Sequence, residues 1–148
     1  MTTQLILVID DSATTRKILE VCLGRQGYEV HSFADGITAL RYLVQPGARL
    51  PDLLFLDLIL PKMDGFEVIR CLKSKPACAG IPIVMLTSRN GVIDRLKGRL
   101  AGVNEYMTKP FKTSQIIQVV HELVGLHEEH RVRAGGFATA LSPHTMRP

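Results

Sequence analysis

The sequence predicts a doubly wound α/β fold, in which helices cover both faces of a parallel β-sheet. Three short runs of strand length are apolar throughout rather than alternating, which is typical of strands that are buried on both faces. Segments with helical periodicity lie between the runs, so that strand and helix alternate five times along the chain. This alternation favours a single parallel sheet with right-handed crossovers.

Five segments are candidate strands. The continuous apolar runs are residues 5–9, 53–56 and 81–86, and a weaker run covers residues 103–107. Residues 28–33 alternate in polarity instead, with successive side chains suited to opposite faces. Because such a strand buries only one face fully, we expect residues 28–33 to lie at the edge of the sheet.

Five helical segments connect the strands. Ser12 is a candidate N-cap for the first helix, which ends at Gly24 or Gly27, and the second helix stops before Pro46. The apolar stripe of the second helix is Ile37, Leu40, Leu43 and Val44, and that of the third is Phe66, Ile69 and Leu72. The fourth helix carries Ile93, Leu96 and Leu100 and ends at Gly102. The fifth begins at Thr113 or Ser114 and carries Ile116, Ile117, Val120, Leu123 and Val124.

The periodic pattern ends near Leu126. Residues 127–148 show no apolar stripe, and chains below about 40 residues rarely fold unaided. We therefore predict one domain over residues 1–126, followed by a flexible C-terminal tail over residues 127–148.

Composition restricts the class of protein. Hydrophobic residues make up 46% of the chain and charged residues 22%, as in ordinary globular proteins. No apolar run is long enough to span a bilayer and no secretory signal is evident, so we expect a cytoplasmic protein without membrane insertion. The net charge of +4 is too small to argue for nucleic-acid binding, and the three cysteines lack the spacing of a zinc site.

Polar side chains that could take part in binding or catalysis lie at or after the ends of four of the predicted strands. Asp10 and Asp11 follow the first strand, Asp57 the third, Thr87 ends the fourth and Lys109 follows the fifth. In an open parallel sheet these carboxyl ends meet at one edge, where ligands bind. Two carboxylates ~4 Å apart repel by ~4 kcal/mol at an effective dielectric of 20, and a divalent cation relieves that cost. A lone Asp there is usually a helix cap or a loop residue, but three together indicate a site for Mg²⁺, which prefers oxygen ligands.

The motifs at these positions resemble those of response-regulator receiver domains. They are VIDDS at residues 8–12, FLDLILPKMDG at 55–65, MLTS at 85–88 and YMTKPF at 106–111, in the order and spacing of that family. The resemblance covers residues 4 to about 126 and implies a flavodoxin-like (βα)5 sandwich with strand order 2-1-3-4-5. A narrower resemblance, in residues 88–102, is to the receivers of pilus-linked chemosensory systems that control twitching motility.

The resemblance implies a role for each acidic residue. Asp57 would be the phosphoacceptor, whose carboxylate attacks phosphorus and becomes an aspartyl phosphate. The side chains of Asp11 and Asp57 and the backbone carbonyl of Ile59 would bind Mg²⁺, or Mn²⁺ in its place, with Asp10 assisting through water.

The remaining residues would stabilise and transmit the phosphorylated state. By resemblance, Lys109 supplies positive charge to the phosphoryl oxygens and Thr87 donates its hydroxyl. The ring of Tyr106 would then fill the space that Thr87 vacates, which alters the face made by the fourth helix, fifth strand and fifth helix. Alternatively, Tyr106 is simply a packed surface tyrosine. The family also suggests a cis bond between Lys109 and Pro110; for Gly65, a tight turn and ordinary helix entry explain the glycine equally well.

Two side chains are expected to set the lifetime of the phosphorylated state. An attacking water would pass the positions two residues after Asp57 and two after Thr87, which are Ile59 and Arg89. Isoleucine cannot orient a water and hinders its entry, and Arg89 can cover the phosphoryl group. We therefore predict slow self-dephosphorylation; the alternative is that both side chains point into solvent without effect.

Taken together, these features predict a stand-alone signalling protein of a two-component phosphorelay. A histidine kinase would phosphorylate it and an unidentified protein would read it, with the chain a monomer or a phosphorylation-dependent dimer. It would be no enzyme toward an external substrate. One alternative is an aspartate-dependent phosphohydrolase, although Ile59 stands where such enzymes commonly carry a second acid; another is a receiver-like module that is never phosphorylated. The basic residues Arg89, Arg95, Lys97 and Arg99 favour an acidic partner, unless they form only a solvated face.

Overall fold

The computed structural model describes the backbone of residues 3–140 and the side chains of residues 3–133. Strand and helix alternate as predicted. In chain order the elements are β1 (Leu5–Ile9), α1 (Ala13–Arg25), β2 (Glu29–Phe33), α2 (Gly36–Leu43), β3 (Leu53–Leu56), α3 (Gly65–Lys73), β4 (Ile83–Thr87), α4 (Val92–Ala101), β5 (Glu105–Thr108) and α5 (Thr113–Ala140).

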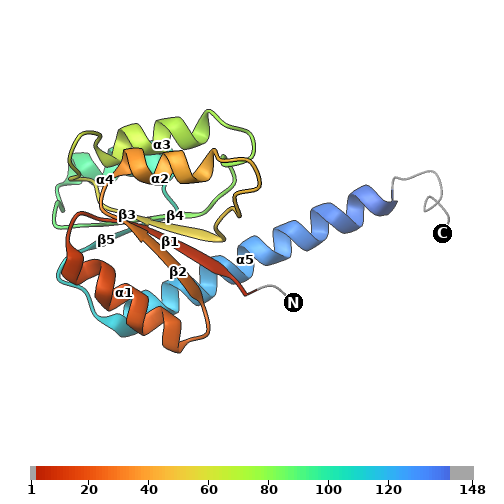
Figure 1. Ribbon diagram of the computed structural model, residues 1–148, viewed down its shortest axis with the longest axis horizontal. Coiled ribbons are helices and arrows are strands. Elements are labelled where there is room, and N and C mark those ends of the chain that lie inside the picture. Colours follow the sequence, from red (N-terminus) through yellow and green to blue (C-terminus); the bar gives the residue numbers. More distant parts are fainter. Residues whose placement is uncertain (1–2, 141–148) are drawn as a thin grey trace.

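The five strands form one parallel sheet in the order β2-β1-β3-β4-β5, which confirms the predicted fold (Figure 1). The three runs that are apolar throughout are the central strands β1, β3 and β4, and every residue of these strands is buried. β2 lies at the edge, as predicted, and all its residues are only half-buried. β5 forms the other edge.

Helices cover both faces of the sheet and enclose two cores. α1 and α5 lie on one face, and α2, α3 and α4 on the other (Figure 1). The first core joins Ile6, Val8 and Phe55 of the sheet to α1 and α5, whereas the second packs Leu7 and Leu54 against α2 and α3. Alternate residues of β1 thus serve opposite cores, which explains why this strand shows no polar positions.

Side-chain caps begin three of the helices. Ser12 accepts a hydrogen bond from the Thr15 N–H, as its predicted role as N-cap requires, and Asp35 does the same for α2. Asp64 and Glu67 form a reciprocal capping box at the start of α3. These caps place the loops that precede the helices, and two of those loops carry residues of the acidic edge.

α4 has the predicted extent, but its apolar stripe does not enter the core. Ile93, Leu96 and Leu100 are all exposed, and Gly98 is the buried residue of this helix. A Cβ atom at Gly98 would lie 3.2 Å from Cδ2 of Tyr106, so the glycine lets α4 approach β5 with that side. The helix therefore turns its leucines outward.

α5 continues beyond the predicted boundary, to Ala140, which corrects the predicted tail for residues 127–140. The segment after Leu126 lacks an apolar stripe, but Glu and Arg are good helix formers and need none to extend an anchored helix. Arg131 pairs with Glu128 at 2.7 Å and approaches Asp52 to 3.6 Å, which ties this part of the helix to the body. Residues 141–148 of the predicted tail lie outside the described residues.

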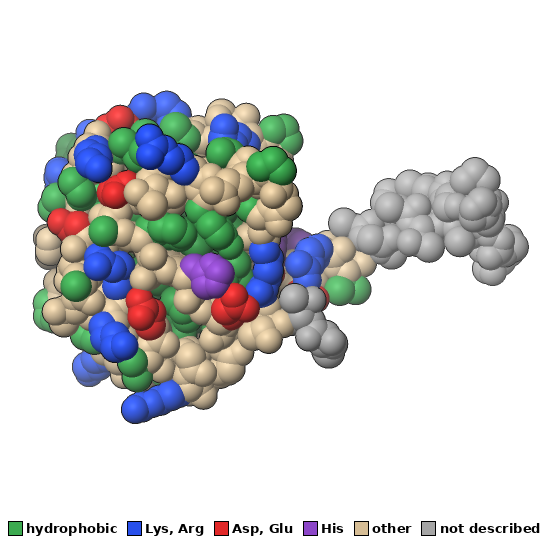
Figure 2. Space-filling view, viewed as in Figure 1, with side chains coloured by type: hydrophobic (Ala, Val, Ile, Leu, Met, Phe, Trp, Pro, Cys, Tyr) green, Lys and Arg blue, Asp and Glu red, His purple; other side chains and the backbone are tan. Residues whose placement is uncertain are grey.

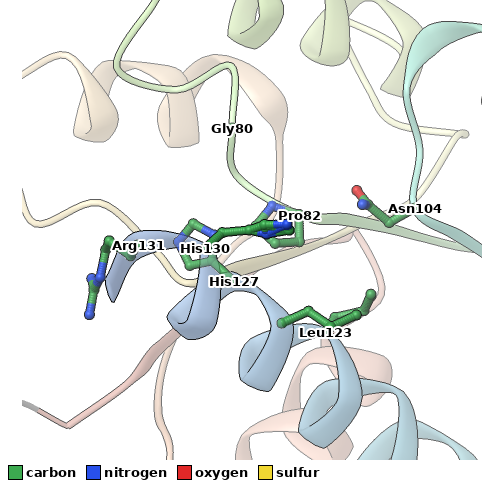
Figure 3. Close-up of a pocket in the computed structure, with 8 residues that line it drawn as sticks. Gly80, Pro82, Asn104, Leu123, His127, His130 and Arg131 are labelled. Carbon is green, nitrogen blue, oxygen red and sulfur yellow. The ribbon is translucent and has the colours of Figure 1, made fainter. Parts of the chain in front are cut away.

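A pocket at the amino-terminal ends of β4 and β5 also involves this extension. His127 and His130 of α5 line it together with Gly80, Pro82 and Asn104 (Figure 3). The pocket lies at the edge of the sheet opposite Asp10 and Asp57.

None of the helices between residues 3 and 140 combines the length and the hydropathy that a bilayer span needs.

Candidate functional site

The carboxyl ends of the strands bring the three predicted acids together. Carboxylate oxygens of Asp10, Asp11 and Asp57 lie within 4.8 Å of one another. Asp10 and Asp57 are buried, with 2% and 6% of their surface exposed, whereas Asp11 is exposed. The cluster therefore combines a buried pair of carboxylates with an acid that solvent can reach.

Lys109 lies between the two buried carboxylates. Its Nζ donates to Asp10 Oδ2 at 2.8 Å and to Asp57 Oδ2 at 3.0 Å. The bond from Lys109 to Pro110 is cis, as predicted. The sequence predicted only that Lys109 lies at the same edge of the sheet as the acids. The structure shows that the loop after β5 places its ammonium group in contact with both buried carboxylates.

The electrostatic balance differs between the acid and the base. Burial raises the pKa of the Asp10 carboxyl, and the hydrogen bonds from Lys109 and from the Ser12 N–H only partly offset it. For Lys109, burial alone would lower the pKa, but the hydrogen bonds to Asp10 and Asp57 outweigh burial and raise it. Lys109 has two carboxylate partners, which hold it in the charged form. Asp10 and Asp57 share this one ammonium group, so the unfavourable burial of the Asp10 carboxylate is only partly offset.

The other carboxylate oxygens are held by the backbone. The Ser12 N–H donates to Asp10 Oδ1 at 2.9 Å, and the Ile59 N–H donates to Asp57 Oδ1 at 3.1 Å. Arg16, from the first turn of α1, donates from its guanidinium to the backbone carbonyl of Asp10 at 2.6 Å. Sequence reasoning missed Arg16; its place four residues after the N-cap Ser12, on the same side of the helix, is the signal that could have indicated it.

The donor set suits a divalent cation. Three carboxylates against one ammonium leave two negative charges without a partner, and all the anionic atoms are hard oxygens. Mg²⁺ prefers such ligands and keeps several waters, which the exposed side of Asp11 would admit. The residues present therefore fit the metal that the sequence predicted.

Gly65 is required by close packing against the Asp57 backbone. A Cβ atom at this position would lie 2.6 Å from the Asp57 carbonyl oxygen and 2.9 Å from Leu58 Cα. The Gly65 N–H donates to the Leu58 carbonyl at 2.9 Å. The sequence left a tight turn and ordinary helix entry open for Gly65, and the structure shows a further reason: the glycine lets the start of α3 pack closely against the loop that carries Asp57.

Thr87, Arg89 and Tyr106 form a chain of contacts beside the acidic cluster. Thr87 ends β4 and is fully buried, and its hydroxyl accepts a hydrogen bond from the Arg89 N–H at 3.4 Å. The Tyr106 hydroxyl donates to the Arg89 carbonyl, and the Arg95 guanidinium lies 5.1 Å from the centre of the Tyr106 ring. The backbone of Arg89 thus links the two residues of the predicted switch.

The side chain of Arg89 is engaged elsewhere. Its guanidinium makes two hydrogen bonds of 3.0 Å to the Asp94 carboxylate in the first turn of α4. The predicted cover over a phosphoryl group would therefore require this ion pair to break. The side chain of Ile59, the second predicted determinant of lifetime, is half exposed at the mouth of the site.

Comparison with known proteins gives a consistent family. A family model described as response regulator receiver domain matches residues 6–121. Protein PilG of Pseudomonas aeruginosa is 33% identical over 115 residues, which cover 78% of this chain and 83% of PilG. The transcriptional regulator RpaA of Synechocystis is 37% identical over 119 residues, 80% of this chain, but the match spans only 48% of RpaA. Several other curated relatives are likewise matched over about half of their length or less.

One similar solved structure contains a magnesium ion. The receiver domain of the sensor histidine kinase PA1611 from Pseudomonas aeruginosa superposes with a TM-score of 0.75 at 30% identity, covering 84% of this chain and 99% of that one. That structure has a magnesium ion coordinated in its active-site cleft.

Proposed function

Because the chain belongs to the response-regulator receiver domain family of two-component systems, we propose that Asp57 accepts a phosphoryl group from a histidine kinase. The observation that carries this proposal is the Lys109 ammonium between Asp10 and Asp57, beside the exposed Asp11. That arrangement places a nucleophilic carboxylate next to a cation and a metal site, which is what phosphoryl transfer needs.

The transfer is an in-line displacement. A carboxylate oxygen of Asp57 forms the new bond to phosphorus while the bond from phosphorus to the kinase histidine breaks, and the imidazole leaves with that electron pair and takes up a proton. The transition state is loose, so the chain contributes mainly position and charge. Lys109 supplies positive charge to the phosphoryl oxygens, and Thr87, at the end of β4, offers its hydroxyl.

The side chains of Asp11 and Asp57 would hold Mg²⁺, with the Ile59 carbonyl as a further ligand and Asp10 assisting through water; Mn²⁺ would serve in its place. The metal contributes positive charge that screens the carboxylate from the incoming dianion. The Ser12 and Ile59 N–H groups orient Asp10 and Asp57 in either case.

Phosphorylation would be read through α4, β5 and α5. A movement of the Thr87 hydroxyl toward the phosphoryl group breaks its contact with the Arg89 N–H, and the Arg89 carbonyl is the acceptor for Tyr106. The Tyr106 ring would then turn inward and change the groove that it lines with Arg95 and Lys112. This is a shift between two packings of one fold.

The pathway can be proposed more narrowly. The resemblance of residues 88–102 to receivers of pilus-linked systems, and the similarity to PilG over most of both chains, support an output that controls pili or motility. In this role the chain turns over no external substrate. Its single-domain status and its oligomeric state after phosphorylation stay predictions of the sequence.

Phosphorylation by a small donor such as acetyl phosphate, followed by intact-mass analysis, tests the proposal. The wild type should gain one phosphoryl group in the presence of Mg²⁺ and none after chelation of the metal. Asp57→Asn should gain none at all, whereas Asp35→Asn, at an acid outside the three-carboxylate cluster, should be labelled like the wild type. Undiminished labelling of Asp57→Asn would sink the assignment of the nucleophile.

A further inference from the structure

α4 exposes four large apolar side chains although it is only ten residues long. Val92 and Leu100 are 82% and 78% exposed, and Ile93 and Leu96 are also exposed, while Gly98 is the buried residue of the helix. The N-cap Gly91 provides no side-chain hydrogen bond. Short helices are stabilised mainly by packing an amphipathic face, so a partner that covers this stripe would supply packing that α4 lacks.

A groove runs along one side of this stripe, between α3 and α4. It has a volume of about 610 Å³, and its accessible apolar wall is formed by Phe66 of α3 and by Leu100 and Ala101 of α4. Lys97 and Leu100 are three residues apart, so they lie on the same side of α4, and both line the groove. A concave apolar groove between two helices is suited to a third helix, which can pack its ridges into it.

The rim of the groove is positively charged. Arg70 and Lys73 of α3 and Lys97 of α4 line it, and among the side chains that the structure describes none of the three is in salt-bridge contact with a carboxylate. Lys73 donates a hydrogen bond to the Ala79 carbonyl at 3.0 Å. The acid at the groove, Asp64, is committed to the capping box of α3. Figure 2 shows lysine and arginine side chains interspersed with hydrophobic ones over the α2 and α3 side of the molecule.

This groove is separate from the surface through which phosphorylation is read. Arg95 and Tyr106 line the groove between α4 and α5, whereas Lys97 and Leu100 line the one beside α3. Residues two apart on a helix point about 200° away from each other, so Arg95 and Lys97 serve opposite sides of α4. A partner could occupy the α3–α4 groove without touching Tyr106.

We propose that the groove between α3 and α4 docks an acidic amphipathic helix of a protein partner. The apolar residues of that helix contact Phe66, Leu100 and Ala101, and its Asp or Glu side chains pair with Arg70, Lys73 and Lys97. The concave shape favours a helix over a flat bilayer, and three like charges on the rim oppose the same groove of a second copy. The unphosphorylated chain already presents this docking site.

Selection from a displayed library of helical peptides tests the proposal with the full, unphosphorylated chain. The library carries leucines along one face and random residues at the flanking positions. We expect the flanking positions of the selected peptides to be enriched in Asp and Glu. Selected peptides should perturb amide resonances of α3 and α4 around Phe66, Arg70 and Leu100, rather than those of β5.

Two groove variants and two matched controls measure the contributions. Lys97→Glu and Leu100→Ser should each weaken a selected peptide at least about tenfold; both side chains are exposed, so the fold should tolerate the changes. Arg41→Glu and Val44→Ser make comparable changes, a charge reversal and a replacement of an apolar side chain by Ser, at exposed positions of α2 and its C-cap, and should leave binding unchanged. Because Arg41→Glu changes the net charge as much as Lys97→Glu does, it separates local pairing from general attraction.

Several results would overturn the proposal. They are neutral or basic flanking residues in the selected peptides, failure of any peptide to be enriched, equal binding by the groove variants, or resonance changes confined to β5 and α5. Binding of the wild type but not Leu100→Ser to vesicles of anionic phospholipid would assign the groove to a membrane. Self-association in sedimentation that Leu100→Ser abolishes would assign it to a second copy.

Discussion

Individual residues at the acidic edge are held by contacts from two directions. Asp57 has one oxygen on the Ile59 N–H and the other on Lys109, and Asp10 is held in the same way by Ser12 and Lys109. Fixed hydrogen-bond partners reduce the reorganisation that a reaction at the carboxylate needs. The residues that would control water, Ile59 and Arg89, are in contrast at the surface or engaged with other groups.

Ile59 should determine how long the phosphorylated state lasts. Its branched side chain lies half exposed at the mouth of the site and cannot orient a water molecule. In Ile59→Asn an amide can do so, and we expect dephosphorylation several-fold faster, given that about 1.4 kcal/mol in the barrier is tenfold in rate. Decay of the labelled protein after removal of the donor measures this rate. A wild-type lifetime of seconds, or equal rates in the two proteins, would contradict the prediction.

Gly65 should tolerate no larger residue. In Gly65→Ala the new Cβ would meet the Asp57 carbonyl at 2.6 Å, so the loop must shift, and we expect a loss of about 1–3 kcal/mol in the free energy of unfolding. The shift also moves Asp57, so labelling by acetyl phosphate should slow. Gly24→Ala in α1, where nothing lies within 4 Å, is the matched control and should be neutral or slightly stabilising. Equal stabilities of the two variants in denaturant would show that the loop adapts freely.

At the scale of elements, capping residues determine where the helices begin and thereby place the loops of the site. Asp64 starts α3 directly after the Asp57 loop, and Ser12 starts α1 directly after Asp10 and Asp11. α4 is the element that packs least: its apolar stripe faces outward and its N-terminus has no side-chain cap. Its position is therefore the one that a binding partner or a movement of Tyr106 can most easily change.

The Asp35 cap of α2 should make stability depend on pH. The Thr38 N–H lowers the pKa of Asp35 below its usual value of 3.8, so the carboxylate stabilises the fold above that pH and the contribution is lost as pH falls through the folded-state pKa. Asp35→Asn keeps an acceptor without titrating. The difference in unfolding free energy between wild type and Asp35→Asn should therefore shrink in acid, which denaturation at several pH values would measure.

Removal of the cap provides the control for this prediction. Asp35→Ala has no acceptor for the Thr38 N–H at 2.8 Å and should lose about 1 kcal/mol relative to Asp35→Asn. That loss should be nearly independent of pH, because neither variant titrates. A difference between wild type and Asp35→Asn that stays constant through the acid range would refute the role of the charge.

On the scale of the whole molecule, the two edges of the sheet have different tasks. The carboxyl edge carries the acidic cluster, while the amino edge is closed by Asp52, whose Oδ2 accepts the Leu5 N–H at 2.9 Å, and by the extension of α5. Strands of four or five residues separate the edges by roughly 15 Å. At that distance the effects of substitutions at the two edges should be independent.

Asp52 should therefore influence stability without influencing phosphorylation. Asp52→Ala leaves the buried Leu5 N–H without a partner and should cost about 1–3 kcal/mol in unfolding free energy, whereas Asp52→Asn keeps the acceptor and should cost less. Arg131→Ala removes the 3.6 Å pair with Asp52 and the 2.7 Å pair with Glu128; because the Arg131 side chain is exposed, the change in stability should stay below about 1 kcal/mol. The labelling rate by acetyl phosphate should be unchanged in all three variants; a slower rate in Asp52→Ala would show that the edges are coupled.

Much of the fold and the identity of the site residues could be predicted from sequence, because both depend on local pattern. The continuous apolar runs became the buried central strands, the alternating run became the edge strand β2, and Ser12 became an N-cap. Once the strands are assigned, their carboxyl ends must meet at one edge, so Asp10, Asp11 and Asp57 were expected together before any distance was known.

Tertiary structure decided what depends on contacts between distant residues. Only the folded chain shows that Lys109 bridges Asp10 and Asp57, that Gly65 packs on the Asp57 backbone and that Arg89 pairs with Asp94. Periodicity reports that α4 has an apolar side but not where it points, and Gly98 against Tyr106 turned that side outward. The extension of α5 to Ala140 has no apolar stripe from which it could have been predicted. It is held instead by the contact of Arg131 with Asp52, which is far away in the sequence.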